Sequence, residues 1–315
     1  LRDEAVMSGS RTVMNGPGAA TLAPARPRLR GRLQIIGALL LATLLGACSA
    51  VRLAYNNLPT VSYWWLDGYV DFDGAQSLRA REELDALLAW HRREELPKVL
   101  ALLRRAQALA PQDITSAQAC EFADAIRDRL LATAVRAEAP AAEVAVTLSP
   151  AQLQQLQAKY AKRNAEYRRE WLSLDAAALH GKRYDRLLDR YEDFYGTLDA
   201  GQRALLRRMT AESVFDATRT DAERRARQAG IVAMLRRFQA ERTPPAEAQA
   251  AIHALVHRIA EPPAGPWREH QLALQDEGCR QLAALHNTTT PSQRGRAVDR
   301  LERYARDVEA LQAAD

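Results

Sequence analysis

The stretch YDRLLDRYEDFYGTL, residues 184–198, indicates most directly how this chain folds. Its apolar side chains recur at steps of three and four residues, at positions 184, 187, 188, 191, 194, 195 and 198. This spacing places them on one face of an α-helix, while Asp, Glu and Arg occupy the other face. The segment is therefore predicted to be an amphipathic helix packed on a core.

Similar periodicity extends along most of the chain. Leu and Ala are abundant whereas Val, Ile and Thr are sparse, a balance that favours helix over sheet. The predicted helices cover 73–110, with Pro97 expected to kink the helix or start a new one, and then 115–139, 150–174 and 184–198, with helical signal continuing from Asp199 to 209. A further element through 231–238 ends at Pro244-Pro245, which opens another to 260, and the last helices cover 267–285 and 291–312. Residues 139–147 are interpreted as a linker, with a possible sub-boundary near 140–149. The predicted fold is all-α, a multi-helix antiparallel bundle with kinked long helices.

Five of these helices begin with the same signal, an N-cap acceptor three residues before a glutamine. This is the capping-box spacing, in which each side chain satisfies a free backbone N–H of the other residue. The five boxes are Asp73–Gln76, Thr115–Gln118, Ser149–Gln152, Asp199–Gln202 and Thr290–Gln293. One interpretation is that they are simply well-made helix starts. The other is that TLSPAQLQQL and TLDAGQRALL resemble the Leu-Thr-x-x-Gln signature of small periplasmic chaperones of the Spy type, which implies binding of unfolded clients without ATP.

The amino-terminal region has the pattern of an export signal. A basic run at 26–32 precedes an apolar stretch at 33–45, which is shorter than the ~20 residues that span a bilayer. The sequence Leu45-Gly-Ala-Cys48 that follows resembles the lipobox of bacterial lipoproteins. This resemblance implies cleavage before Cys48 and lipid on its thiol and new amino group. The resemblance to Gram-negative lipoproteins also implies that Ser49, in place of the Asp that some of them carry, directs the protein to the outer membrane, on its periplasmic face.

The predicted organisation follows from this signal. Residues 1–47 are an upstream segment and signal peptide, residues 48–72 a lipidated anchor with an aromatic juxtamembrane segment, and residues 73–315 a helical domain. The aromatic residues of 51–72 have two interpretations. They meet the headgroup region of a membrane, or they plug the end of the helical core; Asp67, Asp71 and Asp73 favour plugging, because they would repel an anionic surface.

The net charge argues against nucleic-acid binding. The whole chain has 44 basic and 39 acidic residues, a formal net charge of +5. Removing the six Arg and two acidic residues of 1–47 leaves 38 basic and 37 acidic, a net charge of +1. The basic character therefore belongs largely to the signal, and no nucleic-acid partner is expected.

Few residues are candidates for chemistry. His91 and Glu95 share a helical face and could hold a proton or a metal, or else form part of an ion-pair cluster beside Pro97. His253 and His257, also four apart, could chelate a transition metal, but a third ligand is needed. Cys120 and Cys279 either form a disulfide in an oxidising compartment or remain separate and buried. No cofactor is expected.

Three stretches together resemble a known family. LAYNNLPTVSYWWLDGYVDFDGAQ (53–76), WHRREELPKVLALL (90–103) and CRQLAALHNTTTPSQRGRAVDRLERYARD (279–307) are similar to a domain-of-unknown-function family of Gram-negative lipoproteins. The resemblance implies a lipidated, helical, exported protein with no assigned activity. The leading hypothesis is a non-enzymatic chaperone, adaptor or envelope-maintenance protein with a membrane anchor and a periplasmic partner or client. The alternative is a hydrolase or metal-dependent enzyme using His91/Glu95 or His253/His257.

Overall fold

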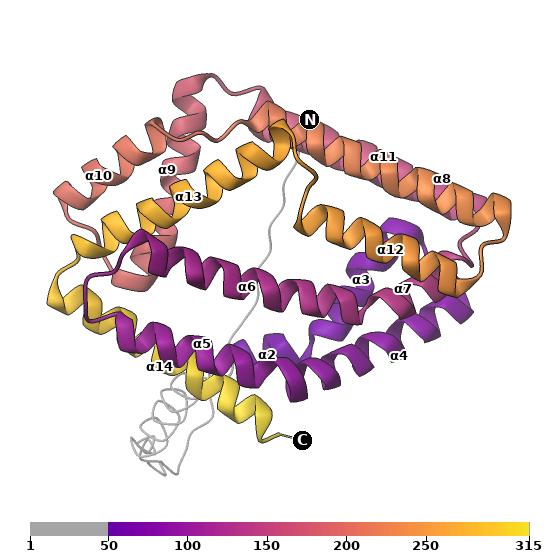
Figure 1. Ribbon diagram of the computed structural model, residues 1–315, viewed down its shortest axis with the longest axis horizontal. Helices are drawn as coiled ribbons and strands as arrows, with labels where there is room; N and C mark the ends of the chain where they lie inside the picture. Colours follow the sequence, from indigo (N-terminus) through magenta and orange to yellow (C-terminus); the bar gives the residue numbers. More distant parts are fainter. Residues whose placement is uncertain (1–49, 315) are drawn as a thin grey trace, which may run out of the picture. The chain divides into compact units, whose positions relative to one another are not determined.

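The computed structural model describes residues 50–314, which belong to one compact unit, Ala47–Asp315 (Figure 1). All regular elements in this part are helical, so the all-α prediction is confirmed. The elements are α2 (Ala50–Asn56), α3 (Leu58–Val70), α4 (Gly74–Trp90), η1 (His91–Glu95), α5 (Leu96–Leu109), α6 (Ser116–Arg136), α7 (Glu138–Ala145), α8 (Pro150–Tyr167), η2 (Arg168–Leu172), α9 (Ala176–Tyr195), α10 (Ala200–Ala211), α11 (Ala217–Glu241), α12 (Pro245–Ala260), α13 (Pro266–Asn287) and α14 (Pro291–Gln312).

The predicted long helix with Pro97 is present as three consecutive segments. α4 runs into a single π-helical turn, η1, and α5 then begins with Pro97 in its first turn. Pro97 has no N–H to donate to the preceding turn, and widening that turn relieves the break in the hydrogen-bond ladder. The N–H of Leu96 accordingly donates to the carbonyl of His91, five residues earlier.

Residues 139–147 are not a linker, contrary to the sequence interpretation. Most of them form α7, with Pro140 in its first turn, where backbone N–H groups have no intrahelical acceptor. Ala142 and Ala145 are buried beside α12, in the same cluster as Ala248. Small side chains allow the two helices to approach closely. The polar N-cap that would have marked the start of α7 is missing, because Ala137 occupies that position.

The buried side chains of residues 50–314 form three clusters, and we group the helices that contain them into two regions. The first region contains α3, α4, α7, α8, α11 and α12, and its core is built around Leu153, Leu156, Leu235 and Phe238. The second region contains α5, α6, α9, α10, α13 and α14, with Tyr195, Leu206 and Leu285 in its core and α6 packed beside α13. α5 lies beside α14, and α8 beside α11 (Figure 1). The helix formed by α4, η1 and α5 belongs to both regions.

The aromatic residues of 51–72 are divided between core and surface. Tyr63 is buried and its hydroxyl lies 2.9 Å from Ser77 Oγ, as the plugging interpretation expects. Trp64 and Trp65 are instead 61% and 58% exposed. The plugging interpretation therefore holds for Tyr63 and not for the two tryptophans. Within residues 50–314, no helix is long and apolar enough to cross a membrane.

Candidate functional site

All five predicted capping boxes form, and four of them do more than cap. In each box the N-cap side chain accepts the N–H of the glutamine, and the glutamine side chain accepts the N–H of the N-cap residue. The hydrogen bonds described for Gln118 stay within its own box. The other four glutamines are buried and bond to one another in two pairs. We call Gln76 with Gln152 the first glutamine pair and Gln202 with Gln293 the second.

The first glutamine pair joins the starts of α4 and α8. Gln152 Nε2 donates to Gln76 Oε1 at 2.6 Å, and Gln76 Nε2 donates to Gln152 Oε1 at 3.3 Å. Each amide also donates to the backbone ahead of the other helix: Gln76 to the Thr147 carbonyl at 3.1 Å, and Gln152 to the Asp71 carbonyl at 2.9 Å. Two helix starts 76 residues apart in sequence are thereby held against each other.

The second glutamine pair repeats this arrangement at the starts of α10 and α14. Gln202 Nε2 donates to Gln293 Oε1 at 2.8 Å, and Gln293 Nε2 donates back at 3.0 Å. Gln202 also donates to the Thr288 carbonyl and Gln293 to the Thr197 carbonyl, both at 3.0 Å. Sequence reasoning recognised the boxes but not the pairing, which depends on which helices meet in space.

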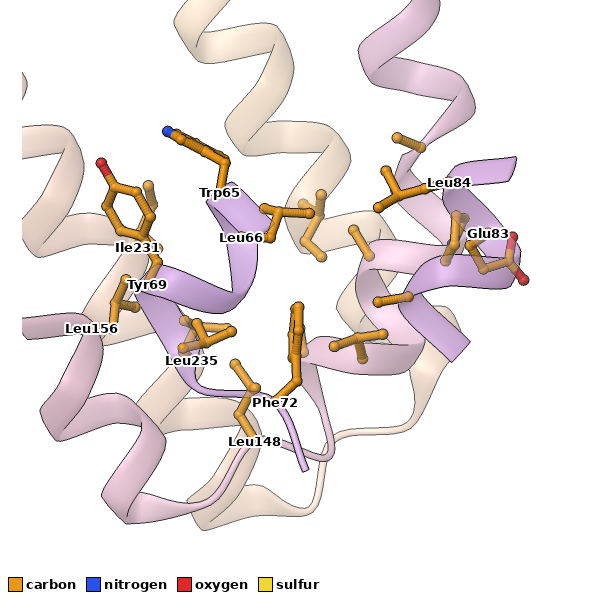
Figure 2. A pocket seen from close by; sticks show the side chains of 18 of the residues that line it. Trp65, Leu66, Tyr69, Phe72, Glu83, Leu84, Leu148, Leu156, Ile231 and Leu235 are labelled. Carbon is orange, nitrogen blue, oxygen red and sulfur yellow. The ribbon is translucent and has the colours of Figure 1, made fainter. Parts of the chain in front are cut away.

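Figure 2 shows an apolar cavity of about 470 Å³, which we call the first cavity. Phe72 and Leu148, which directly precede the two capping boxes, line it together with Trp65, Tyr69 and Leu84. Glu83 and Arg136 are the charged residues among its lining residues, and the Glu83 carboxylate points away from the centre (Figure 2). Such a lining suits an apolar group.

A second cavity of about 520 Å³ lies in the second region. Its wall is also mainly apolar, with Leu103, Phe122 and Leu130 among the lining residues. Ile126 and Leu130, which line it, are 54% and 67% exposed, so large apolar side chains are accessible there. This cavity differs from the first in having two histidines, His91 and His286, in its wall.

His91 and Glu95 interact with different side chains in the structure. His91 Nδ1 lies 2.9 Å from the Tyr55 hydroxyl. Glu95 is buried, and its carboxylate is paired with Lys98 at 2.7 Å and with Arg129 at 3.2 Å. Burial lowers the pKa of His91, and the charge of Glu95 opposes this shift. Glu95 thus connects α5 to α6 rather than forming a hydrogen-bonded pair with His91.

His253 and His257 lie with their ring centroids 4.2 Å apart on α12. His253 Nδ1 is 2.9 Å from Oε2 of Glu138, a buried carboxylate at the start of α7 that sequence reasoning did not single out. No group of three or more His, Cys, Asp or Glu side chains in residues 50–314 is arranged to hold a metal ion. The histidine pair therefore has no third ligand among the described residues.

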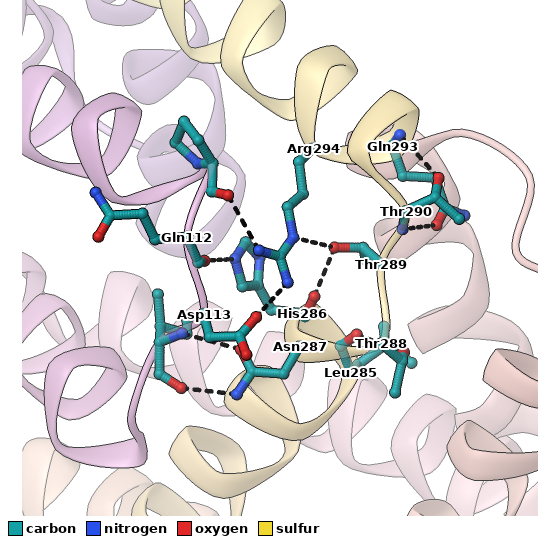
Figure 3. A network of polar contacts seen from close by, with 12 residues as sticks. Gln112, Asp113, Leu285, His286, Asn287, Thr288, Thr289, Thr290, Gln293 and Arg294 are labelled. Atoms are coloured by element: carbon teal, nitrogen blue, oxygen red, sulfur yellow. Dashed lines mark hydrogen bonds and ion pairs between the residues drawn. The ribbon is translucent and has the colours of Figure 1, made fainter.

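A polar network holds the loop between α5 and α6 against the start of α14 (Figure 3). His286 Nε2 donates to the Gln112 carbonyl at 2.7 Å, so its Nδ1 is free to accept from the Tyr195 hydroxyl at 2.9 Å. Arg294 donates to the Pro111 carbonyl and pairs with Asp113. Burial lowers the pKa of His286 and raises that of Tyr195 to about 12, which favours the neutral form of both rings.

Cys120 of α6 and Cys279 of α13 are joined by a disulfide, with their Cα atoms 5.2 Å apart. The bond connects two neighbouring helices that are 159 residues apart in sequence. Of the two alternatives considered for these cysteines, the structure has the bridged one. Cys48, the predicted lipidation site, lies outside the described residues.

The fold and these sites define an all-α protein with two apolar cavities and two buried glutamine pairs. A model of a family of unknown function, DUF6279, matches residues 68–260, more than half of the chain, and the chain therefore belongs to this family. The match contains the stretch 90–103 and the end of 53–76, but not 279–307. No curated protein and no solved structure matches the chain.

Proposed function

We propose that this protein is a lipid-anchored protein of the Gram-negative envelope that binds apolar segments of a periplasmic partner or client without catalysing a reaction. Lipid on Cys48 would hold it to the periplasmic face of the outer membrane. The observation that carries the binding function is the pair of cavities of about 470 and 520 Å³ with mainly apolar walls. Their volumes are in the range of cavities that accommodate an apolar ligand or a few side chains.

Two further features support the proposal. The rims of the cavities carry exposed Trp65, Ile126 and Leu130, and exposed apolar side chains around a hollow are typical of surfaces that bind other molecules. The Cys120–Cys279 disulfide suits an exported protein, because such bonds persist in oxidising compartments.

Filling each cavity separately tests the binding function. Ala141→Trp should fill the first cavity and Ala106→Trp the second, since both residues line these walls without being fully buried. Suppression of the aggregation of a reduced, unfolded model client is the readout, together with binding of an apolar fluorescent probe. At least one variant should lose most of both activities. Ala233→Trp, on the exposed side of α11, is the matched control.

Absence of probe binding and of client protection by the unmodified protein would overturn the binding function. The anchor is tested independently by mass spectrometry of the mature amino terminus. An unmodified Cys48 would overturn the anchor and leave the binding measurements unaffected.

A second candidate, a hydrolase that uses His91, has one specific observation in its favour: His91 lines the second cavity. Its test is the hydrolysis of p-nitrophenyl butyrate by the unmodified protein. A rate above background that His91→Ala abolishes and Ala141→Trp leaves intact would favour the hydrolase over a binding protein.

A further inference from the structure

The first two helices expose a continuous apolar face. Val51, Ala54, Leu58, Val61 and Trp65 are all exposed and follow one another at steps of three and four residues. Backbone hydrogen bonds pass through Asn57, which accepts from Val61 and donates to Leu53, so helical geometry continues from α2 into α3. At helical spacing these five residues share one side. Leu53 and Trp64, 64% and 61% exposed, lie on the next side around.

This face contains no charged side chain. The charged residues between positions 50 and 70 are Arg52 and Asp67. Arg52 pairs with Asp307 of α14 at 3.6 Å, and Asp67 accepts the N–H of Phe72 at 3.0 Å. Both therefore interact with other parts of the described structure. Tyr63, on the opposite side of α3, is buried beneath the guanidinium of Arg81, which lies 3.4 Å from its ring centroid.

The chain just before this face identifies what covers it. A single residue, Ser49, separates Cys48 from Ala50, the first residue of α2. Two residues span at most about 7 Å. With lipid on Cys48, α2 would therefore begin within a few ångströms of the headgroups. Exposed tryptophans beside aliphatic side chains are the composition that membrane interfaces favour.

We propose that the α2–α3 face, defined by Val51, Ala54, Leu58, Val61 and Trp65, lies together with the adjoining Trp64 in the headgroup region of the bilayer that holds the lipid of Cys48. The proposal rests on the lipid anchor in the proposed function and adds a second membrane contact to it. Asp71 and Asp73, which argued against membrane contact on sequence grounds, follow the end of α3, where the left-handed backbone of Asp71 (φ 55°) ends the helix beyond the last residue of the face. Asp73 is moreover the N-cap of α4 and accepts the N–H of Gln76. The two tryptophans also bring the rim of the first cavity close to the membrane, because Trp65 lines that cavity.

Quenching of tryptophan fluorescence by bromine tests this contact. The full chain, purified from membranes in detergent, is reconstituted into vesicles of phosphatidylethanolamine and phosphatidylglycerol (3:1), with and without a phosphatidylcholine brominated near the headgroup end of its chains. Bromine should quench part of the emission, and the double variant Trp64→Phe/Trp65→Phe should lose that part. Trp267→Phe is the control and should keep it. Equal quenching in the double variant and the unmodified chain would overturn the contact.

A second measurement separates the face from the anchor. Residues 49–315 lie within the compact unit that has its own core, so this chain can be tested without lipid. It should bind the same vesicles weakly, and Val61→Glu/Trp65→Glu should weaken binding about tenfold or more. Binding that is insensitive to this change would overturn the face. A dimer in light scattering that the same variant dissociates would also overturn it, because a second copy would then cover the face. If either result is obtained but lipid is found on Cys48, the proposed lipid anchor is still supported.

Discussion

Gln76 and Gln152 in the first region, and Gln202 and Gln293 in the second, exchange amide hydrogen bonds in the same way but in different surroundings. The first pair adjoins Phe72 and Leu148, which face an apolar cavity. The second adjoins the network of His286 and Arg294, which attaches the 110–115 loop. The amide hydrogen bonds common to both pairs hold two helix starts together in either surrounding. Both regions have an apolar cavity, but only in the second is the glutamine pair joined by a polar network, and the disulfide attaches to α13 of that region.

Removing the disulfide should have the largest effect and should act mainly on the second region. The Cys120→Ser/Cys279→Ser variant frees a loop of 159 residues, which the chain-entropy account values at about 5 kcal/mol. Urea unfolding monitored by circular dichroism measures the loss. Native-state hydrogen exchange should accelerate more in α6 and α13 than in α8 and α11. Equal acceleration in all four helices would contradict the division into two regions.

Breaking either glutamine pair should have the next largest effect on stability. Gln202→Ala removes both hydrogen bonds across the buried pair and the donor to the Thr288 carbonyl, an expected loss of about 3 kcal/mol of unfolding free energy. Gln76→Ala should cost a similar amount in the first region. Gln118→Ala is the matched control, because it removes a capping box without a pair, and should cost about 1 kcal/mol. If all three variants lose the same free energy, the pairing has no energetic role.

Loss of the loop network should have a smaller effect, confined to the second region. Arg294→Ala removes the donors to Pro111 and to Asp113, for an expected cost of about 1–2 kcal/mol. Hydrogen exchange of residues 110–115 should accelerate. Arg236→Ala, which removes an exposed bond to Gln157 in the first region, serves as the control and should change stability by less than about 0.5 kcal/mol.

The smallest expected effect is a pH dependence that originates at His286. Because burial lowers its pKa below the ordinary 6.5, the folded state binds a proton less readily than the unfolded chain. Its contribution to stability is complete above pH 6.5 and is lost as the pH falls through the lowered pKa. The thermal midpoint should therefore decrease on acidification, and less steeply in His286→Gln. His180→Gln, at an exposed position, should keep the slope of the unmodified protein.

Local patterns in the sequence predicted most of the helices, because capping and periodicity are local properties. The stripe at 184–198 forms α9 and the turn after it, and the five boxes mark five helix starts. α7 was missed because Ala137 gives no N-cap signal and Pro140 resembles a linker residue. The cavities and the glutamine pairing could not be predicted, since both depend on which helices meet. The buried Glu138 beside His253 was missed for the same reason.

The π-helical turn at His91–Glu95 has a consequence for the phase of the long helix. Ala80, Leu84 and Leu87 of α4 line the first cavity, while Val99, Leu103 and Ala106 of α5 line the second. In an uninterrupted helix of about 100° per residue, the mean directions of these two sets would differ by roughly 80–110°. One additional residue in the widened turn offsets this difference by about 100°, so that the two sets point in nearly the same direction. The extra residue that accommodates Pro97 thus also sets the rotation of α5 relative to α4 about the helix axis. As a result, one continuous helix lines both cavities with nearly the same side.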